Sequence, residues 1–499
     1  MFTLLSSRDH QVVYGRRGTG KTHALVYLSE SIRSQGDIPV YIDMRNIGST
    51  GGIYSDTALP ITERATRLLM DTLTPIHEAI LDYVVNSESL VDLSQIGSPL
   101  DGFADAITEV KVYGEVTREE VASSEQTNKS ATGLRGSLSS SGAGLSVEQT
   151  GDRAENKMHS ARVVESGTFQ HRIHFGAVSK FLRDIMKILP SKRMWVLLDE
   201  WSVIPPDLQP FLADLLRRSI FPIQDITVKI GAIEQRSKFQ IPGKLGDYIG
   251  IELGSDASAD INLDDFMVFD NDKNRAIDFF RELVFKHFKS VIDSDFTFTE
   301  NIERFIQNAF TQENTFEEFV RASEGVPRDS INILSLAAQK AINKAVSIQH
   351  LRAASQTWYQ RDKEAAVSSN TDASQLLHWI IDNVIGHRKA RAFLLRNNVR
   401  SELIDALFDS RVLHLLKRNV SALDQPGLRY DVYKLDYGCY VDLLTTVRAP
   451  KGFLFEELED FELDSAENIA VPQDDYRAIR RAILNVSEFQ NTLPSAYIR

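Results

Sequence analysis

The sequence is poor in cysteine: among 499 residues there is one, Cys439. A single thiol excludes an internal disulfide framework and any metal knuckle built from two cysteines. Long apolar runs are missing too, since no stretch approaches the 18 residues that a membrane-spanning helix needs. The first residues open directly into a strand-like run, without the pattern of a signal peptide. We therefore expect a cytoplasmic protein with no membrane partner.

A surplus of positive charge is also absent, because the formal net charge is -13. This argues against a chain that coats nucleic acid through bulk charge. The charge is uneven, however. Residues 374–450 carry 11 basic and 8 acidic side chains, whereas residues 451–499 carry 5 and 10. A local basic module therefore remains compatible with the acidic total.

Near the N-terminus the sequence contains a phosphate-binding loop. The stretch GRRGTGKT over residues 15–22 lies between the apolar run QVVY and the helix-like segment THALVYLSESIRS. A strand, a glycine-rich loop and a helix in this order let backbone N–H groups cradle phosphate at the positive end of the helix. Lys21 is expected to reach the β- and γ-phosphates of ATP, and the Thr22 hydroxyl to ligate Mg²⁺. The residues expected to hold the nucleotide are Gly15, Gly18, Thr19, Gly20, Lys21 and Thr22.

A second motif, MWVLLDE, reads as an apolar strand that ends in two acids. Asp199 at the carboxyl end of this strand is placed to hold Mg²⁺, and Glu200 to orient and activate the attacking water. Downstream of a phosphate-binding loop, this pair indicates an ATPase.

The segments IPVYIDMR, MWVLLDE and ITVKIGAIE read as buried strands with apolar residues on both faces, which is typical of a parallel sheet covered by helices. We predict an α/β core over residues 1–255. Alternating and Ser/Gly-rich segments indicate an insertion at about 102–170, part flexible and part β-hairpin; the alternative is a disordered linker. Residues 256–366 form a helical domain, and residues 451–499 an acidic tail.

Residues 374–450 contain two helix-like segments followed by two strands, VLHLLKR and LRYDVYKLDYGCYVDLL, joined by a turn with QPG. Helices followed by a β-hairpin are typical of a winged helix, and Cys439 is expected to be buried in its second strand. A winged helix contacts either DNA or other protein surfaces. The side chains available for DNA phosphates are Arg400, Arg411, Lys417, Arg418 and Arg429.

In EGVPRDSINIL, Gly325 and Pro327 precede a helix that begins near Arg328. Together with the two ATP motifs, GVPRD resembles an AAA+ ATPase of the origin-recognition-complex-like branch, over most of residues 8–450. The run YIDMRNIGSTGGIY resembles a bacterial subgroup. The resemblance implies a P-loop AAA+ core, a helical lid and a C-terminal winged helix, with ATP between core and lid and Arg328 reaching back to it. It also implies a polar sensor near the γ-phosphate, for which Glu234 and Gln235 are the candidates, and it points to anti-phage or mobile-element systems.

The sequence departs from this family where an arginine finger is expected, since IGIELGSDASADINLDD has no arginine. Arg217 or Arg218 is the substitute candidate. Arg16 and Arg17 face either the triphosphate or a neighbouring subunit. His171 and His174 alternate in a strand but lack a third metal ligand.

We expect a Mg²⁺-dependent ATPase in which ATP binding and hydrolysis control engagement of double-stranded DNA or a partner protein. The alternative is a slowly hydrolysing, nucleotide-gated oligomeric scaffold that signals to a separate effector without binding DNA. A small-molecule kinase fits less well, since such an enzyme has no need for GVPRD and a winged helix.

Overall fold

The computed structural model describes residues 2–47, 54–86, 91–108, 110–113, 119–122, 161–164, 168–171, 173–189, 192–266, 269, 272–291, 301–385, 392–399, 401–421, 427–445 and 482–491. The middle of the expected insertion, most of the expected acidic tail and Arg400 lie outside these residues.

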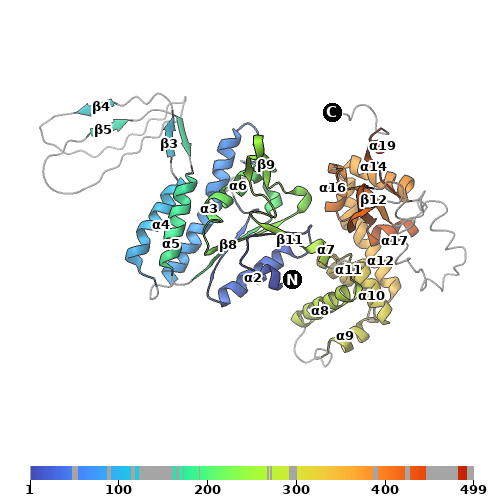
Figure 1. Ribbon diagram of the computed structural model, residues 1–499. Helices are drawn as coiled ribbons and strands as arrows, with labels where there is room; N and C mark the ends of the chain where they lie inside the picture. The colour runs from blue at the N-terminus through green and yellow to red at the C-terminus, as the bar shows by residue number, and fades with distance from the viewer. Residues whose placement is uncertain are drawn as a thin grey trace, which may run out of the picture.

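The core is built on a five-stranded parallel sheet in the order β11-β1-β8-β7-β2 (Figure 1). Its strands are β1 (Gln11–Tyr14), β2 (Ile38–Asp43), β7 (Met194–Asp199), β8 (Ile226–Ala232) and β11 (Ser258–Asn262). Every residue of β7 and β8 is buried, as expected for the centre of a parallel sheet. Because β8 lies between β1 and β7, the loop after β1 and the acids after β7 reach the same edge of the sheet.

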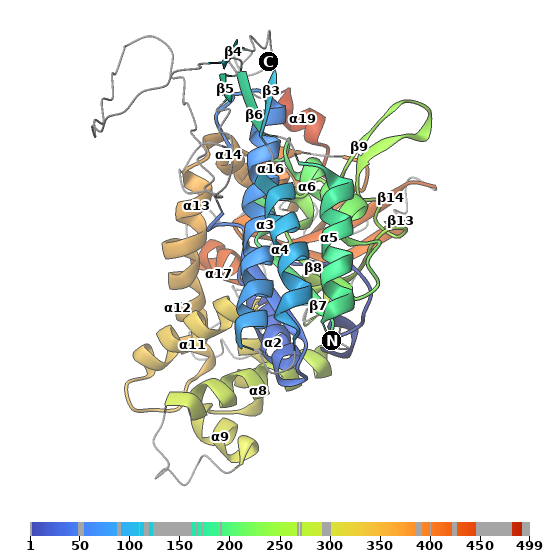
Figure 2. The same cartoon turned by 90° about the vertical axis from the view of Figure 1, so that its left-hand side faces the viewer.

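Helices cover both faces of this sheet. Residues of β7 alternate between the faces: Trp195 and Leu197 belong to one apolar cluster and Val196 to the other. On the first face lies α2 (Lys21–Ser34). The helices of the second face are α3 (Ile61–Asn86), α5 (Phe175–Ile188) and α6 (Gln209–Leu215). Figure 2 shows α3, α4 (Leu93–Thr108) and α5 side by side in front of the sheet.

The expected insertion is partly helical and partly β. The helix α4 extends to Thr108, beyond the predicted start of the insertion. The strands β3 (Val110–Tyr113) and β6 (Thr168–His171) then pair antiparallel, as do β4 (Glu119–Ala122) and β5 (Ala161–Val164). The two alternating segments thus form a ribbon that extends away from α4 and α5 (Figure 1).

Five helices follow the core and are termed the lid here: α8 (Lys273–Val291), α9 (Ile302–Ala309), α10 (Glu313–Ala322), α11 (Pro327–Ala341) and α12 (Ile348–Trp358). Their centre is aromatic, with Phe280, Phe316 and Phe319 buried and in ring contact. A π-helical turn, Tyr359–Glu364, ends the lid.

Residues 365–445 and 482–491 are termed the C-terminal unit. Its helices are α13 (Ala365–Ser368), α14 (Thr371–Trp379), a π-helical turn Ile380–Ile385, α16 (Glu402–Asp409), α17 (Tyr437–Thr445) and α19 (Val486–Gln490). Its three antiparallel strands are β12 (Ala392–Arg396), β14 (Arg429–Leu435) and β13 (Leu413–Ser421), in that spatial order. The expected winged helix began at residue 374 and had no counterpart of β12. The helix α14 begins earlier, at Thr371, and Asn370 caps it by accepting from the Ala373 backbone N–H.

The predicted second strand of this unit is wrong in its C-terminal half. The chain leaves β14 at Leu435 and begins α17 at Tyr437, so Cys439 lies in a helix, although it is buried as expected. The cause is Asp436, whose carboxylate accepts from the Cys439 backbone N–H and whose carbonyl accepts from Tyr440 N–H. An aspartate that satisfies the first free N–H groups starts a helix even where the following residues alternate.

The described part of the expected tail belongs to the C-terminal unit. Leu394 of β12 exchanges backbone hydrogen bonds with Ala482 and Leu484, and Val486 and Phe489 lie in the unit's apolar cluster. A segment near residue 490 therefore completes this unit.

Candidate nucleotide site

The loop between β1 and α2 has the shape of a phosphate cradle. Gly18 and Gly20 adopt positive φ angles of 88° and 97°, which side chains with a Cβ rarely take. The Lys21 ammonium lies inside the loop and donates to the carbonyl oxygens of Gly15 (2.6 Å) and Arg16 (3.1 Å). Burial lowers the pKa of Lys21, while the nearby carboxylates of Glu200, Asp264 and Asp199 act in the opposite direction. The loop thus holds one cation among carbonyl groups at the start of a helix.

The two acids at the end of β7, Asp199 within the strand and Glu200 just after it, lie beside this loop. Asp199 is 0% exposed, and its carboxylate accepts from the Tyr41 hydroxyl (2.8 Å) and from the Glu200 backbone N–H (2.9 Å). Glu200 has a φ of 56°, an uncommon left-handed conformation for a residue with a long side chain. This turn sends the Glu200 side chain into the pocket while Asp199 stays in the sheet edge.

Gly231 in β8 makes room for the Asp199 carboxylate. A Cβ at this position would lie 2.9 Å from Asp199 Oδ1 and 3.0 Å from Leu25 Cδ1. We expect Gly231→Ala to lower the free energy of unfolding by about 1–3 kcal/mol, because a fully packed site has to shift. Chemical denaturation measures this. The matched control is Gly97→Ala in α4, where a Cβ meets no atom within 4 Å; equal stability of the two variants would contradict the close packing of Asp199.

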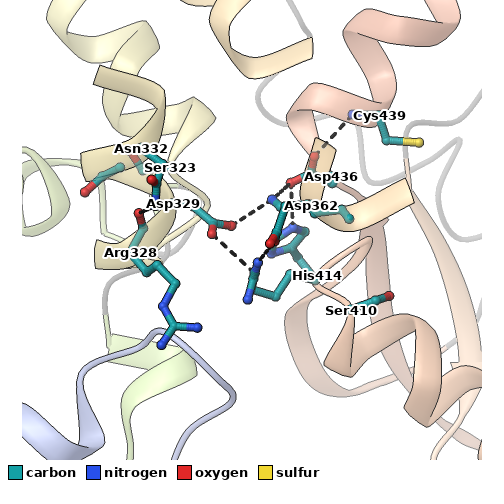
Figure 3. A network of polar contacts seen from close by, with 12 residues as sticks. Ser323, Arg328, Asp329, Asn332, Asp362, Ser410, His414, Asp436 and Cys439 are labelled. Atoms are coloured by element: carbon teal, nitrogen blue, oxygen red, sulfur yellow. Dashed lines mark hydrogen bonds and ion pairs between the residues drawn. The ribbon is translucent and has the colours of Figure 1, made fainter. Parts of the chain in front are cut away.

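The core and the lid meet in a pocket of about 700 Å³ at this sheet edge. Arg328 enters it from the first turn of α11, where its backbone N–H donates to the Gly18 carbonyl (3.3 Å). In Figure 3, Arg328 points down toward the ribbon of the N-terminal residues, while Asp329 points to the right, toward Asp362, His414 and Asp436. The lining residues are Arg17, Gly18, Gly20, Lys21, Thr22, His23, Val26, Arg45, Glu200, Val203 and Arg328.

Tyr41, Arg45 and Gly231 are among the residues of this site that the sequence motifs did not indicate. Tyr41 of β2 holds Asp199, and Arg45 lines the pocket while its guanidinium pairs with Asp43 at 2.6 Å. Asp43 ends β2 opposite Asp199, the last residue of β7. Arg45 comes two residues after β2, and residues just after parallel strands lie at the sheet edge where ligands bind. That position is the signal that could have identified Arg45.

The sensor candidates lie outside the pocket. The Glu234 carboxylate accepts two hydrogen bonds from Arg418 of the C-terminal unit, at 3.0 and 2.6 Å, and one from Asn262. Gln235 is not among the lining residues either. In this arrangement Glu234 connects the core to the C-terminal unit rather than to the nucleotide pocket.

Arg16 and Arg17 lie in different surroundings. Arg17 lines the pocket, consistent with one of the two expected alternatives. The expectation for Arg16 is wrong, since its side chain is 2% exposed and contacts Asp264, Leu413 and His414 of the same chain.

The basic residues proposed for DNA are partly engaged within the chain. Arg411 is buried, lies 3.2 Å from Asp329 and pairs with Asp362. Arg418 pairs with Glu234. Lys417 is exposed on β13, and Arg429, exposed at the start of β14, donates to the Asn419 carbonyl (3.2 Å). Two of the five residues therefore meet carboxylates of their own chain in the place of phosphate.

The substitute arginine fingers also have partners, because Arg217 and Arg218 both pair with Asp214, at 2.9 and 2.8 Å. His174 caps α5 by accepting from Ala177 N–H. Within the described ranges, no group of three His, Cys, Asp or Glu side chains is placed to hold a metal ion by itself. No helix of the described chain is long and apolar enough to cross a membrane.

A parallel sheet in this order, a phosphate-binding loop, acids at the neighbouring strand end and a helical lid define a mixed α/β P-loop protein of the AAA+ class. Residues 1–384 match the ORC-CDC6-like family, and the chain belongs to that family. Members of this family are generally ATPases that bind nucleotide and DNA. Among solved structures, the Orc1 protein of Aeropyrum pernix in complex with DNA shares 14% identity, covers 90% of this chain and 88% of its own, and has a TM-score of 0.30. None of the curated proteins matches the sequence.

Proposed function

We propose that this protein is a Mg²⁺-dependent ATPase whose nucleotide state controls its engagement of DNA. The observation that carries the proposal is the joint lining of one pocket by Lys21, Thr22 and Glu200 of the core and Arg328 of the lid. A triphosphate bound there contacts both the core and the lid, so its loss removes contacts that connect these two domains.

The donor set suits Mg²⁺, because the Thr22 hydroxyl and the Asp199 carboxylate are hard oxygen ligands. Thr22 lines the pocket, and the Asp199 carboxylate lies near the Lys21 ammonium, whose pKa it acts to raise. The ion would be held by these two residues and would neutralise charge that develops on the phosphates.

The residues named in this proposal have separate tasks. The backbone of Gly15, Gly18, Thr19 and Gly20 holds the phosphates, Lys21 and Arg328 supply positive charge, and Glu200 accepts a proton from the attacking water. The strained turn at Glu200 fixes that carboxylate at the mouth of the pocket. After hydrolysis, ADP lacks the γ-phosphate that Lys21 of the core and Arg328 of the lid both contact in this proposal.

The C-terminal unit, with α16 before the β13–β14 hairpin, is proposed to act as a winged helix that meets double-stranded DNA. Lys417 and Arg429, on the strands of this hairpin, are the described residues placed for backbone phosphates. Arg400 is retained as a candidate. Self-association and a role in anti-phage or mobile-element systems stay predictions.

A second function is favoured by one observation: Arg411 and Arg418 are occupied by the chain's own carboxylates, and Arg217 and Arg218 by Asp214. A slowly hydrolysing scaffold that signals to a partner needs neither free DNA contacts nor a finger in trans.

The two functions differ in a simple assay, the ATPase rate with and without duplex DNA. We expect duplex DNA to raise the rate at low salt and Lys417→Ala/Arg429→Ala to weaken DNA binding by about 1 kcal/mol or more, with a shallower salt dependence. A rate indifferent to DNA, together with no binding at 50 mM salt, would favour the scaffold.

A further inference from the structure

Arg16 belongs to the phosphate-binding loop but lies outside the lining of the nucleotide pocket. Its backbone N–H donates to Asp264 (2.9 Å), and its carbonyl accepts from Lys21 and from the Thr19 hydroxyl. Its guanidinium lies 3.0 Å from Asp264 and donates to the carbonyl of Leu413 (2.9 Å). One residue therefore joins the position of Lys21 to a strand of the C-terminal unit.

The second partner of the guanidinium in that unit is His414, whose Nδ1 lies 2.6 Å from an Arg16 terminal nitrogen. Arginine is only a donor, so Nδ1 has to be the acceptor and the ring proton sits on Nε2, which faces Asp436 at 3.1 Å. Burial lowers the pKa of His414 well below its usual value, and the Arg16 charge acts in the same direction. The imidazole is thus held neutral, in the tautomer that Arg16 requires.

The contact between core and C-terminal unit is polar. Besides the contacts of Arg16, which also lies over the Phe408 ring, it includes the pairs Glu234–Arg418 and Arg236–Asp409. Among the described residues, no apolar cluster contains side chains of both parts. The lid differs, since Tyr437 and Val441 of α17 lie in its aromatic cluster. The lid and the C-terminal unit are therefore joined by apolar packing, whereas the C-terminal unit contacts the core through charged groups.

Buried ion pairs beside Arg328 connect the start of α11 to the C-terminal unit. Asp329, the next residue, lies 2.8 Å from Lys363 and 3.2 Å from Arg411, and Lys363 lies 2.6 Å from Asp436 (Figure 3). Asp436 is also the partner of His414. A continuous chain of contacts therefore runs from the phosphate-binding loop through the C-terminal unit to the lid arginine.

We propose that Arg16 is a positioning residue of the nucleotide site, which gives the phosphate-binding loop its binding shape only while His414 of the C-terminal unit is docked against it. This inference rests on the proposed nucleotide binding. Buried ion pairs return little net free energy after desolvation, so an interface made of them is nearly balanced. An interface of this kind opens and closes with small changes in the nucleotide site, whereas an apolar core does not.

The first test replaces His414, which lies outside the pocket. His414→Leu removes the acceptor for Arg16, whereas His414→Asn keeps an oxygen acceptor near the Nδ1 position; both lose the contact with Asp436. We expect His414→Leu to weaken binding of Mg-ATP and Mg-ADP by about 10- to 100-fold, the range of one hydrogen bond to a charged group. His414→Asn should stay within about threefold of the wild type. Equilibrium titration with a fluorescent nucleotide measures both, and thermal unfolding shows that both variants are folded.

The second test is a double-mutant cycle. Arg16→Met is expected to weaken nucleotide binding at least as much as His414→Leu does, because it removes the contacts with Asp264 and Leu413 as well as the contact with His414. The double variant should be no weaker than Arg16→Met, because that variant has already lost the Arg16–His414 contact. Arg33→Met, which removes an exposed arginine paired with Glu30, is the matched control. Additive effects, or wild-type affinity of His414→Leu, would overturn the inference. If the wild type itself binds neither nucleotide, the proposed function fails instead.

Discussion

Replacement of Lys21 by alanine is expected to abolish ATP binding under ordinary assay conditions. Lys21 is 5% exposed and is the cation enclosed by the phosphate-binding loop. A buried charge that faces the phosphates contributes more than a surface charge, because water screens it little. Truncation of one partner in such a pair costs about 3–5 kcal/mol, which corresponds to a loss of affinity of about 100-fold or more. Equilibrium titration with labelled ATP and ADP measures the loss.

The fold should survive this change. Lys21 donates to loop carbonyls, but its charged form is disfavoured by burial, as its lowered pKa indicates. Removal of the ammonium therefore relieves part of a desolvation cost. Lys21→Met, which keeps most of the apolar stem, is the matched variant and should bind as weakly as Lys21→Ala. Near-normal ATP affinity in both variants would show that the phosphates lie elsewhere.

The second large effect is expected for Glu200→Gln, which should bind ATP but turn it over about 100- to 10,000-fold more slowly. General base catalysis by a placed carboxylate contributes a factor of this size. Glutamine has the same shape and retains the left-handed backbone at this position, so the substitution changes charge and leaves geometry alone. Single-turnover hydrolysis measured beside nucleotide affinity separates the two steps.

Asp199→Asn provides the contrast. The carboxylate of Asp199 accepts from Tyr41 and is enclosed in the sheet. Its replacement should weaken Mg²⁺-dependent binding as well as turnover, whereas Glu200→Gln should affect turnover alone. Full turnover by Glu200→Gln would remove Glu200 from the role of base, and an effect on affinity alone would assign it to binding.

The gathering of the glycine-rich loop, Glu200 and Arg328 around one pocket was predictable because the position of each depends on local sequence. Gly18 and Gly20 are needed where φ is positive, and Lys21 has to follow the last glycine to lie in the loop. Asp199 and Glu200 follow a fully apolar strand, which places them at a sheet edge. Arg328 follows a proline at the first turn of a helix.

The C-terminal unit was harder to predict because its apolar patterns fit two structures. The residues after Leu435 alternate like a strand but form α17 once Asp436 caps them. Periodicity cannot separate these outcomes in a short segment. The strand β12 pairs with β14, about 35 residues later in the chain, and with Ala482 and Leu484. No local pattern indicates such partners.

By itself, the sequence determined an α/β core with a phosphate-binding loop, acids at the end of a buried strand and a lid arginine, because backbone conformation and strand burial are encoded in neighbouring residues. The tertiary structure decided which charges meet. Arg16 met His414, and Glu234 met Arg418, instead of nucleotide or DNA. The physical reason is that Coulomb attraction acts between groups that are close in space, and a buried charge requires a partner. The residues next to an arginine or glutamate in the sequence do not indicate which partner it will meet.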